Sequence, residues 1–429
     1  MRRPIPTRFL LALAAALLLS LCAAVPVGAT ISAPALNAGS AVTIRSLLKA
    51  MREGDDASAM WVFRTAADPA IHVVAAMVVE RIHFHLDAAT LDARLCERDL
   101  IGSRPGVALL CGEFISGDQR LAGKYAEALD TERGLLARFR GHRVDKALNG
   151  IQAFLDAQAK LPPLSYGPRP AGAVSIPLTQ AWSPVFDAHA NGHTFRLELD
   201  TGATGLVLGE GVARRLGVRL LGRKTQINGW LSRDVVAQLG ILNELDFGGI
   251  TLRHVPVKVV PQDFALIGVN LLAPLGAIRI THRALTIYGN GPAVPACDTQ
   301  MLTGSNLWGT SLRLFPEVLV NGKPQAVELD TGAGRYLLGT RQALAEVDAL
   351  HRGEIRFGDI GGRHPMTSVD SAKVKLTIAD QPIEIYFVVL TGSSSPHGLT
   401  LGAGALRDMD FLLDFRRSSQ CFMLHPDLH

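Results

Sequence analysis

The sequence predicts a mainly β fold made of two duplicated lobes and preceded by an α-helical N-terminal domain. Asp-Thr-Gly-Ala occurs twice, at residues 200–203 and 330–333, each time after an apolar-alternating run typical of a strand. An Asn-Gly dipeptide, which favours a hairpin turn, precedes each copy at 191–192 and 321–322. Both features repeat with one offset, since 330 − 200 and 321 − 191 both give 130. Residues before about 160 instead show helical spacing.

The repeat continues beyond these motifs. Leu266-Ile267-Gly268 is echoed by Thr400-Leu401-Gly402, and each copy then ends in a strand-like run, at 285–288 and at 421–424. The composition changes at Gly289-Asn290-Gly291-Pro292, which we interpret as the boundary between the copies. The sequence therefore predicts a duplicated unit of roughly 120 residues.

The N-terminus has the layout of a secretory signal peptide, predicted over residues 1–29. Three arginines precede an apolar run at 9–19, and Val27-Gly28-Ala29 offers a small-residue cleavage site. An N-terminal membrane anchor is the alternative, although the run is short for a spanning helix. A lipoprotein attached at Cys22 is disfavoured because Leu21 is large. We expect a periplasmic or secreted protein with no stable membrane insertion after cleavage.

The charge of the mature chain gives no reason to expect a nucleic-acid partner. The full chain carries a net charge of +4, and removing the three leader arginines leaves about +1 (4 − 3). The spacing of the cysteines indicates no metal site, and the sequence predicts neither a metal nor a cofactor.

Four cysteines remain in the mature chain, an even count that suggests two disulfides in an oxidising compartment. We favour Cys96 with Cys111 and Cys297 with Cys421, because each pair lies inside one predicted region. Buried free thiols are the alternative.

Residues 30–161 are predicted to form the α-helical domain, which resembles a small helical-hairpin array cut by Gly, Asp and Pro breakers. A module that docks a protein partner and a cap packed on the rest of the chain are both open interpretations. Residues 162–173 are predicted to be a proline-rich linker, because proline disfavours helix and central strand. The first lobe is then expected at 174–292 and the second at 301–429.

The two aspartates are the candidate catalytic residues. Two carboxylates held close together in a partly desolvated site share one proton, because like charges raise one pKa strongly. The ionised member can take a proton from a water that attacks a peptide carbonyl, while the protonated member donates to the developing oxyanion. We assign Asp200 and Asp330 to this pair and leave the order of their roles open.

The residues after each aspartate are expected to support the pair. The hydroxyls of Thr201 and Thr331 would hydrogen-bond across the two turns, and Gly202 and Gly332 would present N–H groups to the carboxylates.

These motifs resemble those of the bacterial retropepsin-like and pepsin-like aspartyl proteases, over roughly residues 174–429. The resemblance implies a bilobal aspartic-protease-like β fold, with the dyad at the junction of two retropepsin-like lobes and a hairpin flap over the cleft. Carried over by position, the substrate-binding flap turns would lie at Gly229 and Trp230 in the first lobe, and at Gly361 and Gly362 in the second.

The predicted function is that of an exported aspartic endopeptidase that hydrolyses peptide or protein substrates with a dyad-activated water. The alternative is a periplasmic peptide-binding or scaffold protein that retains the fold with little or no turnover. Two intact acids favour the enzyme, since a binding module has no need of both. A third and less favoured possibility is that lobes of two separate chains pair with each other.

Overall fold

The computed structural model describes part of the 429-residue chain. The predicted signal peptide, residues 1–29, lies outside the described residues, as does the start of the predicted helical domain. The described ranges are 44–142, 144–158, 161–179, 183–229, 232–290, 293–344, 350–378, 380–390 and 396–425.

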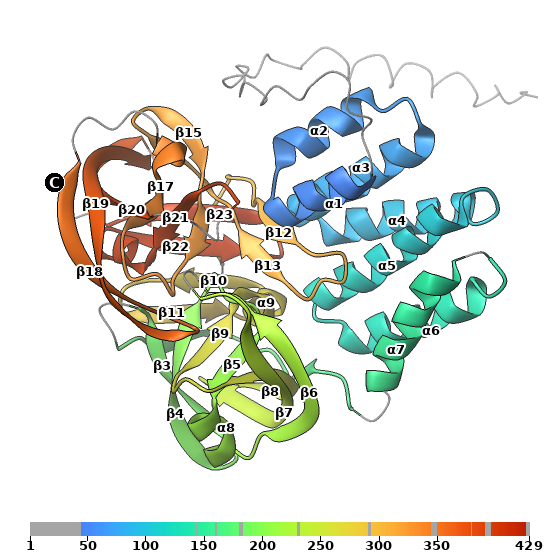
Figure 1. Ribbon diagram of the computed structural model, residues 1–429, viewed down its shortest axis with the longest axis horizontal. Coiled ribbons are helices and arrows are strands. Elements are labelled where there is room, and N and C mark those ends of the chain that lie inside the picture. Colours follow the sequence, from blue (N-terminus) through green and yellow to red (C-terminus); the bar gives the residue numbers. More distant parts are fainter. Residues whose placement is uncertain are drawn as a thin grey trace, which may run out of the picture. The chain divides into compact units, whose positions relative to one another are not determined.

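The first part of the described chain is helical, as the spacing of apolar residues predicts. Asp68 accepts a hydrogen bond from the Ala70 backbone nitrogen at 2.9 Å and caps α3, which starts at Pro69, a residue favoured at the first helical position. Successive helices run back and forth beside one another (Figure 1). The helices are α1 (Ile44–Glu53), α2 (Asp56–Thr65), α3 (Pro69–Ile82), α4 (Leu86–Leu100), α5 (Pro105–Leu121), α6 (Tyr125–Arg138) and α7 (Asp145–Gln158).

The strands of the first lobe form one sheet in the order β1-β8-β5-β9-β4-β3-β7-β6. Asn191 (φ 48°) and Gly192 (φ 77°) turn β3 into β4 with the backbone that an Asn-Gly hairpin requires. These strands are β1 (Ser165–Tyr166), β3 (Val185–Ala190), β4 (His193–Asp200), β5 (Leu206–Gly209), β6 (Arg219–Ile227), β7 (Val235–Phe247), β8 (Ile250–Val260) and β9 (Ala265–Gly268); the lobe also holds α8 (Glu210–Arg215), α9 (Val269–Leu272) and a 3₁₀ turn (Ala273–Leu275).

The second lobe repeats this plan in the strand order β15-β14-β19-β20-β17-β21-β16, with β18 paired to β19. Asn321 (φ 51°) and Gly322 (φ 77°) form the matching hairpin turn. Its strands are β14 (Glu317–Val320), β15 (Lys323–Ala326), β16 (Glu328–Asp330), β17 (Leu337–Thr340), β18 (His351–Asp359), β19 (Gly362–Ile378), β20 (Gln381–Leu390) and β21 (Leu399–Gly402); 3₁₀ turns cover Arg341–Leu344 and Ala403–Arg407. The prediction of a mainly β, bilobal aspartic-protease-like fold after a helical region is confirmed.

A further sheet contains strands from both lobes, in the order β2-β11-β10-β22-β23. The strand-like runs expected to close each copy are β11 and β23, and both belong to this sheet. The disulfide between Cys297 and Cys421 attaches the chain after β11 to β23, and Cys96 is joined to Cys111 in the helical part, so both favoured pairings are confirmed. The strands are β2 (Ala173–Pro177), β10 (Ala277–Ile280), β11 (Ala284–Tyr288), β22 (Met409–Asp414) and β23 (Ser419–Leu424).

The helical part contacts the second lobe through the fully buried side chain of Arg81. Its guanidinium donates to Asp118 at 2.7 Å and to the carbonyl oxygen of Leu307 at 2.9 Å. Leu307 lies between β12 (Thr303–Ser305) and β13 (Leu312–Leu314), a short hairpin that precedes β14. A buried ion pair thus lies within this contact.

The segment predicted to be a linker is partly ordered into the sheet. Ser165 and Tyr166 form β1, which pairs with β8 at the edge of the sheet. The neighbouring prolines are tolerated there, because an edge position requires no backbone N–H on its outer side.

Among the described residues, no helix is long and apolar enough to cross a membrane.

Candidate active site

Asp200 ends β4, where the parallel strand β9 places Gly268 directly opposite it. The backbone N–H groups of Gly202 and Ala203 donate to Asp200 Oδ1 at 3.0 and 2.9 Å, so the turn folds back onto the carboxylate. A Cβ on Gly268 would lie 2.2 Å from the carbonyl oxygen of Ala203. Glycine is therefore required for β9 to pass behind the turn.

Asp330 occupies the equivalent place in the second lobe. It ends β16 opposite Gly402 of β21, and the Gly332 N–H donates to its Oδ1 at 3.0 Å. The side chain is buried. A Cβ on Gly402 would lie 2.3 Å from the carbonyl oxygen of Ala333, which repeats the tight packing of the first lobe.

The two turns are joined by reciprocal hydrogen bonds of their threonines. Thr201 Oγ1 donates to the carbonyl oxygen of Leu329 at 2.8 Å, and Thr331 Oγ1 donates to that of Leu199 at 2.6 Å. Each hydroxyl also accepts from the backbone N–H of the other threonine, at 3.0 and 3.1 Å. Both threonines are fully buried. The four bonds fix the separation and orientation of the two strand ends.

Each carboxylate lies against the glycine of the opposite turn. A Cβ built on Gly202 would lie 2.5 Å from Asp330 Cγ, and one built on Gly332 would lie 2.6 Å from Asp200 Cγ. A side chain at either position would displace the opposite carboxylate. The structure therefore brings the two predicted acids to one place, with the two glycines directly beneath them.

Burial and nearby negative charges both raise the pKa of Asp200. Burial is the largest cause that raises its pKa well above the ordinary 3.8, and the negative charges of Asp330 and Glu198 raise it further. A hydrogen bond with Asp330 also raises the pKa, whereas the bond from Ala203 lowers it. The arrangement favours a pair of carboxyls that retains a proton at mildly acidic pH.

Glu198 is a third acid near the pair that the sequence interpretation missed. Burial raises its pKa to about 7, against a hydrogen bond from Ser183, and the charge of Asp330 adds to the increase. Its equivalent, Glu328, lies 3.5 Å from the guanidinium of Arg313. A glutamate two residues before each aspartate points to the same face of a strand, and this repeated pattern was the signal available.

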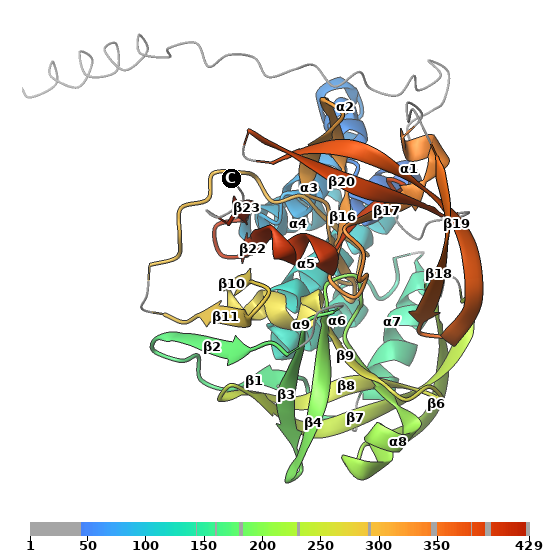
Figure 2. The same cartoon turned by 90° about the vertical axis from the view of Figure 1, so that its left-hand side faces the viewer.

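Two hairpins carry the residues predicted to lie at the flap turns, and their tips contact one another. They are β6–β7, which contains Gly229 and Ser232 between its strands, and β18–β19, which turns at Gly361 just before Gly362. Figure 2 shows the end of β18 next to β6. Ser232 donates from its backbone nitrogen to Asp359 Oδ2 at 2.7 Å. Trp230 lies outside the described residues.

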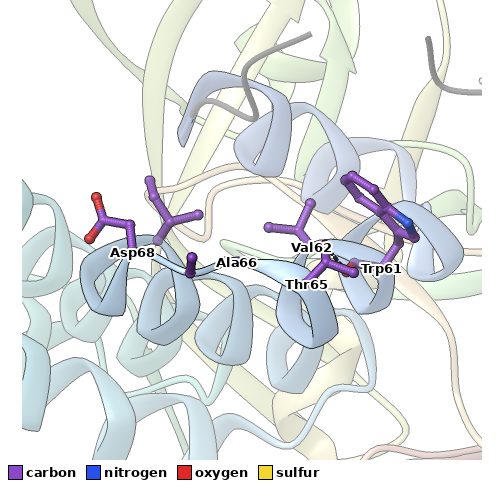
Figure 3. A pocket seen from close by; sticks show the side chains of 7 residues that line it. Trp61, Val62, Thr65, Ala66 and Asp68 are labelled. Atoms are coloured by element: carbon purple, nitrogen blue, oxygen red, sulfur yellow. Dashed lines mark hydrogen bonds between the residues drawn. The ribbon is translucent and has the colours of Figure 1, made fainter. Parts of the chain in front are cut away.

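A pocket in the helical part lies at the end of α2 and the start of α3. Trp61 and Asp68 stand at its opposite ends (Figure 3). None of the predicted site residues lines it, so it is separate from the aspartate pair. Its lining comprises Trp61, Val62, Thr65, Ala66, Ala67, Asp68 and Ile71.

Residues 186–273 match the family model described as "gag-polyprotein putative aspartyl protease". The match contains Asp200, its turn and the β9 strand behind it. The first lobe is therefore similar to this aspartyl protease family over the matched residues. The second lobe repeats the Asp-Thr-Gly turn, its hairpin and its supporting glycine, and the family match together with this fold supports a protease.

Similar solved structures include two aspartic proteases. One is a retropepsin-like aspartic protease from Rickettsia conorii, 22% identical over 30% of this chain and 96% of that chain, with a TM-score of 0.23. The other is an aspartic proteinase from Irpex lacteus, 12% identical over 59% of this chain and 98% of that chain, with a TM-score of 0.36. No curated protein matches the chain.

Proposed function

We propose that this protein is an exported aspartic endopeptidase in which Asp200 and Asp330 activate a water that hydrolyses peptide bonds. The observation that carries the proposal is the reciprocal threonine bonding, which holds two carboxyl-bearing turns so that each acid contacts the other turn's glycine. Such fixed geometry is what general acid–base catalysis requires.

The chemistry follows from a shared proton. The ionised carboxylate takes a proton from the bound water as its oxygen attacks the carbonyl carbon, and the protonated carboxyl donates to the carbonyl oxygen. The N–H groups of Gly202 and Gly332 orient the carboxylates by donating to one oxygen of each. The protonated carboxyl then donates its proton to the departing amine while the other carboxylate takes a hydroxyl proton from the tetrahedral intermediate, so that the C–N bond breaks, the carbonyl re-forms and the dyad again holds one proton. The mechanism calls on no cofactor.

Export to the periplasm or beyond is part of the proposal. The signal-like leader and the two disulfides support it, because disulfides persist in oxidising compartments. We expect the substrate to be a peptide or an unfolded protein segment, and we propose docking of a protein partner as the role of the helical part. Neither a nucleic acid nor a stable membrane anchor belongs to this function.

The test is cleavage of denatured casein by the mature chain across about pH 3 to 8, with pepstatin as inhibitor. Asp200→Asn and Asp330→Asn should each reduce the rate by about 10²-fold or more, since general acid–base catalysis contributes on that order. Asp187→Asn, at an exposed position of β3, is the matched control and should leave the rate unchanged. Cleavage that survives in either dyad variant, or no cleavage by folded protein at any pH, would favour the peptide-binding alternative.

A further inference from the structure

One nearly buried carboxylate connects the tips of the β6–β7 and β18–β19 hairpins. The side chain of Asp359, at the end of β18, is only 7% exposed although it lies at a hairpin tip. It accepts hydrogen bonds from the backbone nitrogen and the hydroxyl of Ser232, both at 2.7 Å. These two residues lie 127 positions apart and belong to different lobes.

The second hairpin supplies further donors to the same carboxylate. The Gly361 N–H donates to Asp359 Oδ1 at 2.9 Å, and His364 Nε2 lies 2.9 Å from that oxygen. Asp359 Oδ1 thus accepts a hydrogen bond within its own turn, from Gly361. Both carboxylate oxygens accept hydrogen bonds from Ser232 of the opposite hairpin. We refer to Asp359, Ser232, Gly361 and His364 as the tip cluster.

The tip cluster does not have the geometry of a nucleophilic triad. His364 meets both the Ser232 hydroxyl, at 3.3 Å, and the Asp359 carboxylate through one ring nitrogen, Nε2. A triad requires the histidine to contact the acid through one nitrogen and the hydroxyl through the other. The Ser232 hydroxyl also donates directly to the Asp359 carboxylate, so these residues connect the two hairpins.

Close packing accompanies these bonds. A Cβ on Gly229 would lie 2.6 Å from Asp359 Oδ2, and a Cβ on Gly361 would lie 1.8 Å from the Ser232 hydroxyl oxygen. Gln262 adds a bond from the first lobe by donating to the carbonyl oxygen of Gly361 at 3.0 Å. The two turns therefore approach each other at glycines, where side chains would keep them apart.

The β18–β19 hairpin also packs against apolar clusters that the two aspartate turns contact. Ile360 packs against the same apolar cluster as Ala203, which follows the first Asp-Thr-Gly motif. Ile355 of β18 packs against the cluster that includes Ala333, which follows the second. The hairpin thus packs against the same two apolar clusters as the residues that follow the two Asp-Thr-Gly motifs.

We propose that Asp359 is a positioning residue whose carboxylate ties the two hairpins to each other beside the aspartate turns. The inference rests on the proposed function for its purpose, although the tie itself is independent of catalysis. Asp359→Asn retains the shape of the side chain, but an NH₂ group replaces one of the two accepting oxygens. This donor would face the hydrogen-bond donors of Ser232 or Gly361, so at least one of these bonds is lost.

Hydrogen exchange measured by mass spectrometry tests the tie in the full mature chain carrying Asp200→Asn, which prevents self-cleavage. Asp359→Asn and Ser232→Ala should each speed exchange about tenfold or more in the peptides of both hairpins that contain Ser232 and Gly361. Asp370→Asn, farther along β19, is the control and should leave both peptides unchanged. Circular dichroism checks that each variant is folded.

Unchanged exchange in folded Asp359→Asn protein would overturn the proposal. Faster exchange confined to the β18–β19 peptide would also overturn it, because the carboxylate would then stabilise only its own turn. Since the readout needs no turnover, its failure is distinct from failure of the casein assay.

Discussion

The hydroxyl oxygen of Thr201 accepts a hydrogen bond from the backbone nitrogen of Thr331 at 3.0 Å, and the converse bond is 3.1 Å long. The two residues lie 130 positions apart and are both fully buried. This near-symmetric pair is where the two copies of the repeat meet. The catalytic proposal depends on it, because it sets where the carboxylates stand.

Thr331→Val should therefore destabilise the protein. The valine removes an acceptor from the Thr201 N–H and a donor from the carbonyl of Leu199, and it leaves both groups buried without these partners. We expect a loss of about 2–4 kcal/mol in the free energy of unfolding, measured by urea denaturation. Thr331→Ser retains the hydroxyl and should recover most of this loss. Equal stability of the valine and serine variants would show that the bonds contribute little.

Gly332→Ala should abolish activity while leaving the protein folded. The new Cβ would lie 2.6 Å from Asp200 Cγ, so the carboxylate must move. Displacement of a catalytic group by about 1 Å can cost about 10²-fold in rate, and we expect a loss of casein cleavage of at least that size. Gly353→Ala on β18, where a Cβ meets open space, is the control. Normal cleavage by the Gly332 variant would contradict the geometry of the pair.

Asp200→Asn should be more stable than the wild type at neutral pH but not at acidic pH. The pKa of Asp200 is raised in the folded protein, so the unfolded chain releases this proton first. The contribution to stability is complete below the ordinary pKa of 3.8 and is lost as the pH rises towards the raised value. The advantage of the variant should grow above pH 3.8 by up to about 1.4 kcal/mol per pH unit.

Urea denaturation at several pH values measures this difference. Exposed Asp187→Asn is the control, and its stability should run parallel to that of the wild type. A difference between Asp200→Asn and wild type that stays constant with pH would show that Asp200 is not perturbed.

Arg81→Met should weaken the contact between the helical part and the second lobe. Removing the arginine leaves the carboxylate of Asp118 buried without its ion partner, and the Leu307 carbonyl loses a donor. The expected cost is about 3–5 kcal/mol in the free energy of unfolding. Adding Asp118→Leu should restore part of that loss. Arg98→Met, which breaks the exposed pair with Asp99, is the matched control and should cost less than about 1 kcal/mol. Equal costs for both arginine variants would argue against a role of burial.

The sequence predicted the parts of the site that depend on local chain geometry. A strand that ends in Asp-Thr-Gly places its acid on a turn wherever it folds, and Asn-Gly turns demand positive φ angles, so both could be inferred from short segments. The contact between Ser232 and Asp359 could not be inferred, because it depends on how two distant hairpins curve towards each other. Glu198 was missed for a different reason. Alternation placed it on one face of β4, but only the packed structure shows that it lies close enough for the charge of Asp330 to affect its pKa.

The sheet formed by β2, β11, β10, β22 and β23 constrains when the molecule can be completed. Strand β10 of the first lobe has β22 as one neighbour, in a register that pairs Ala277 with Asp414. A nascent chain that has emerged only as far as residue 400 therefore lacks one side of that ladder, however well its first copy has folded. The ladder closes only when Met409–Asp414 pairs with β10 and with Ser419–Leu424. Folding of the first copy is therefore completed by strands that lie more than a hundred residues later in the chain.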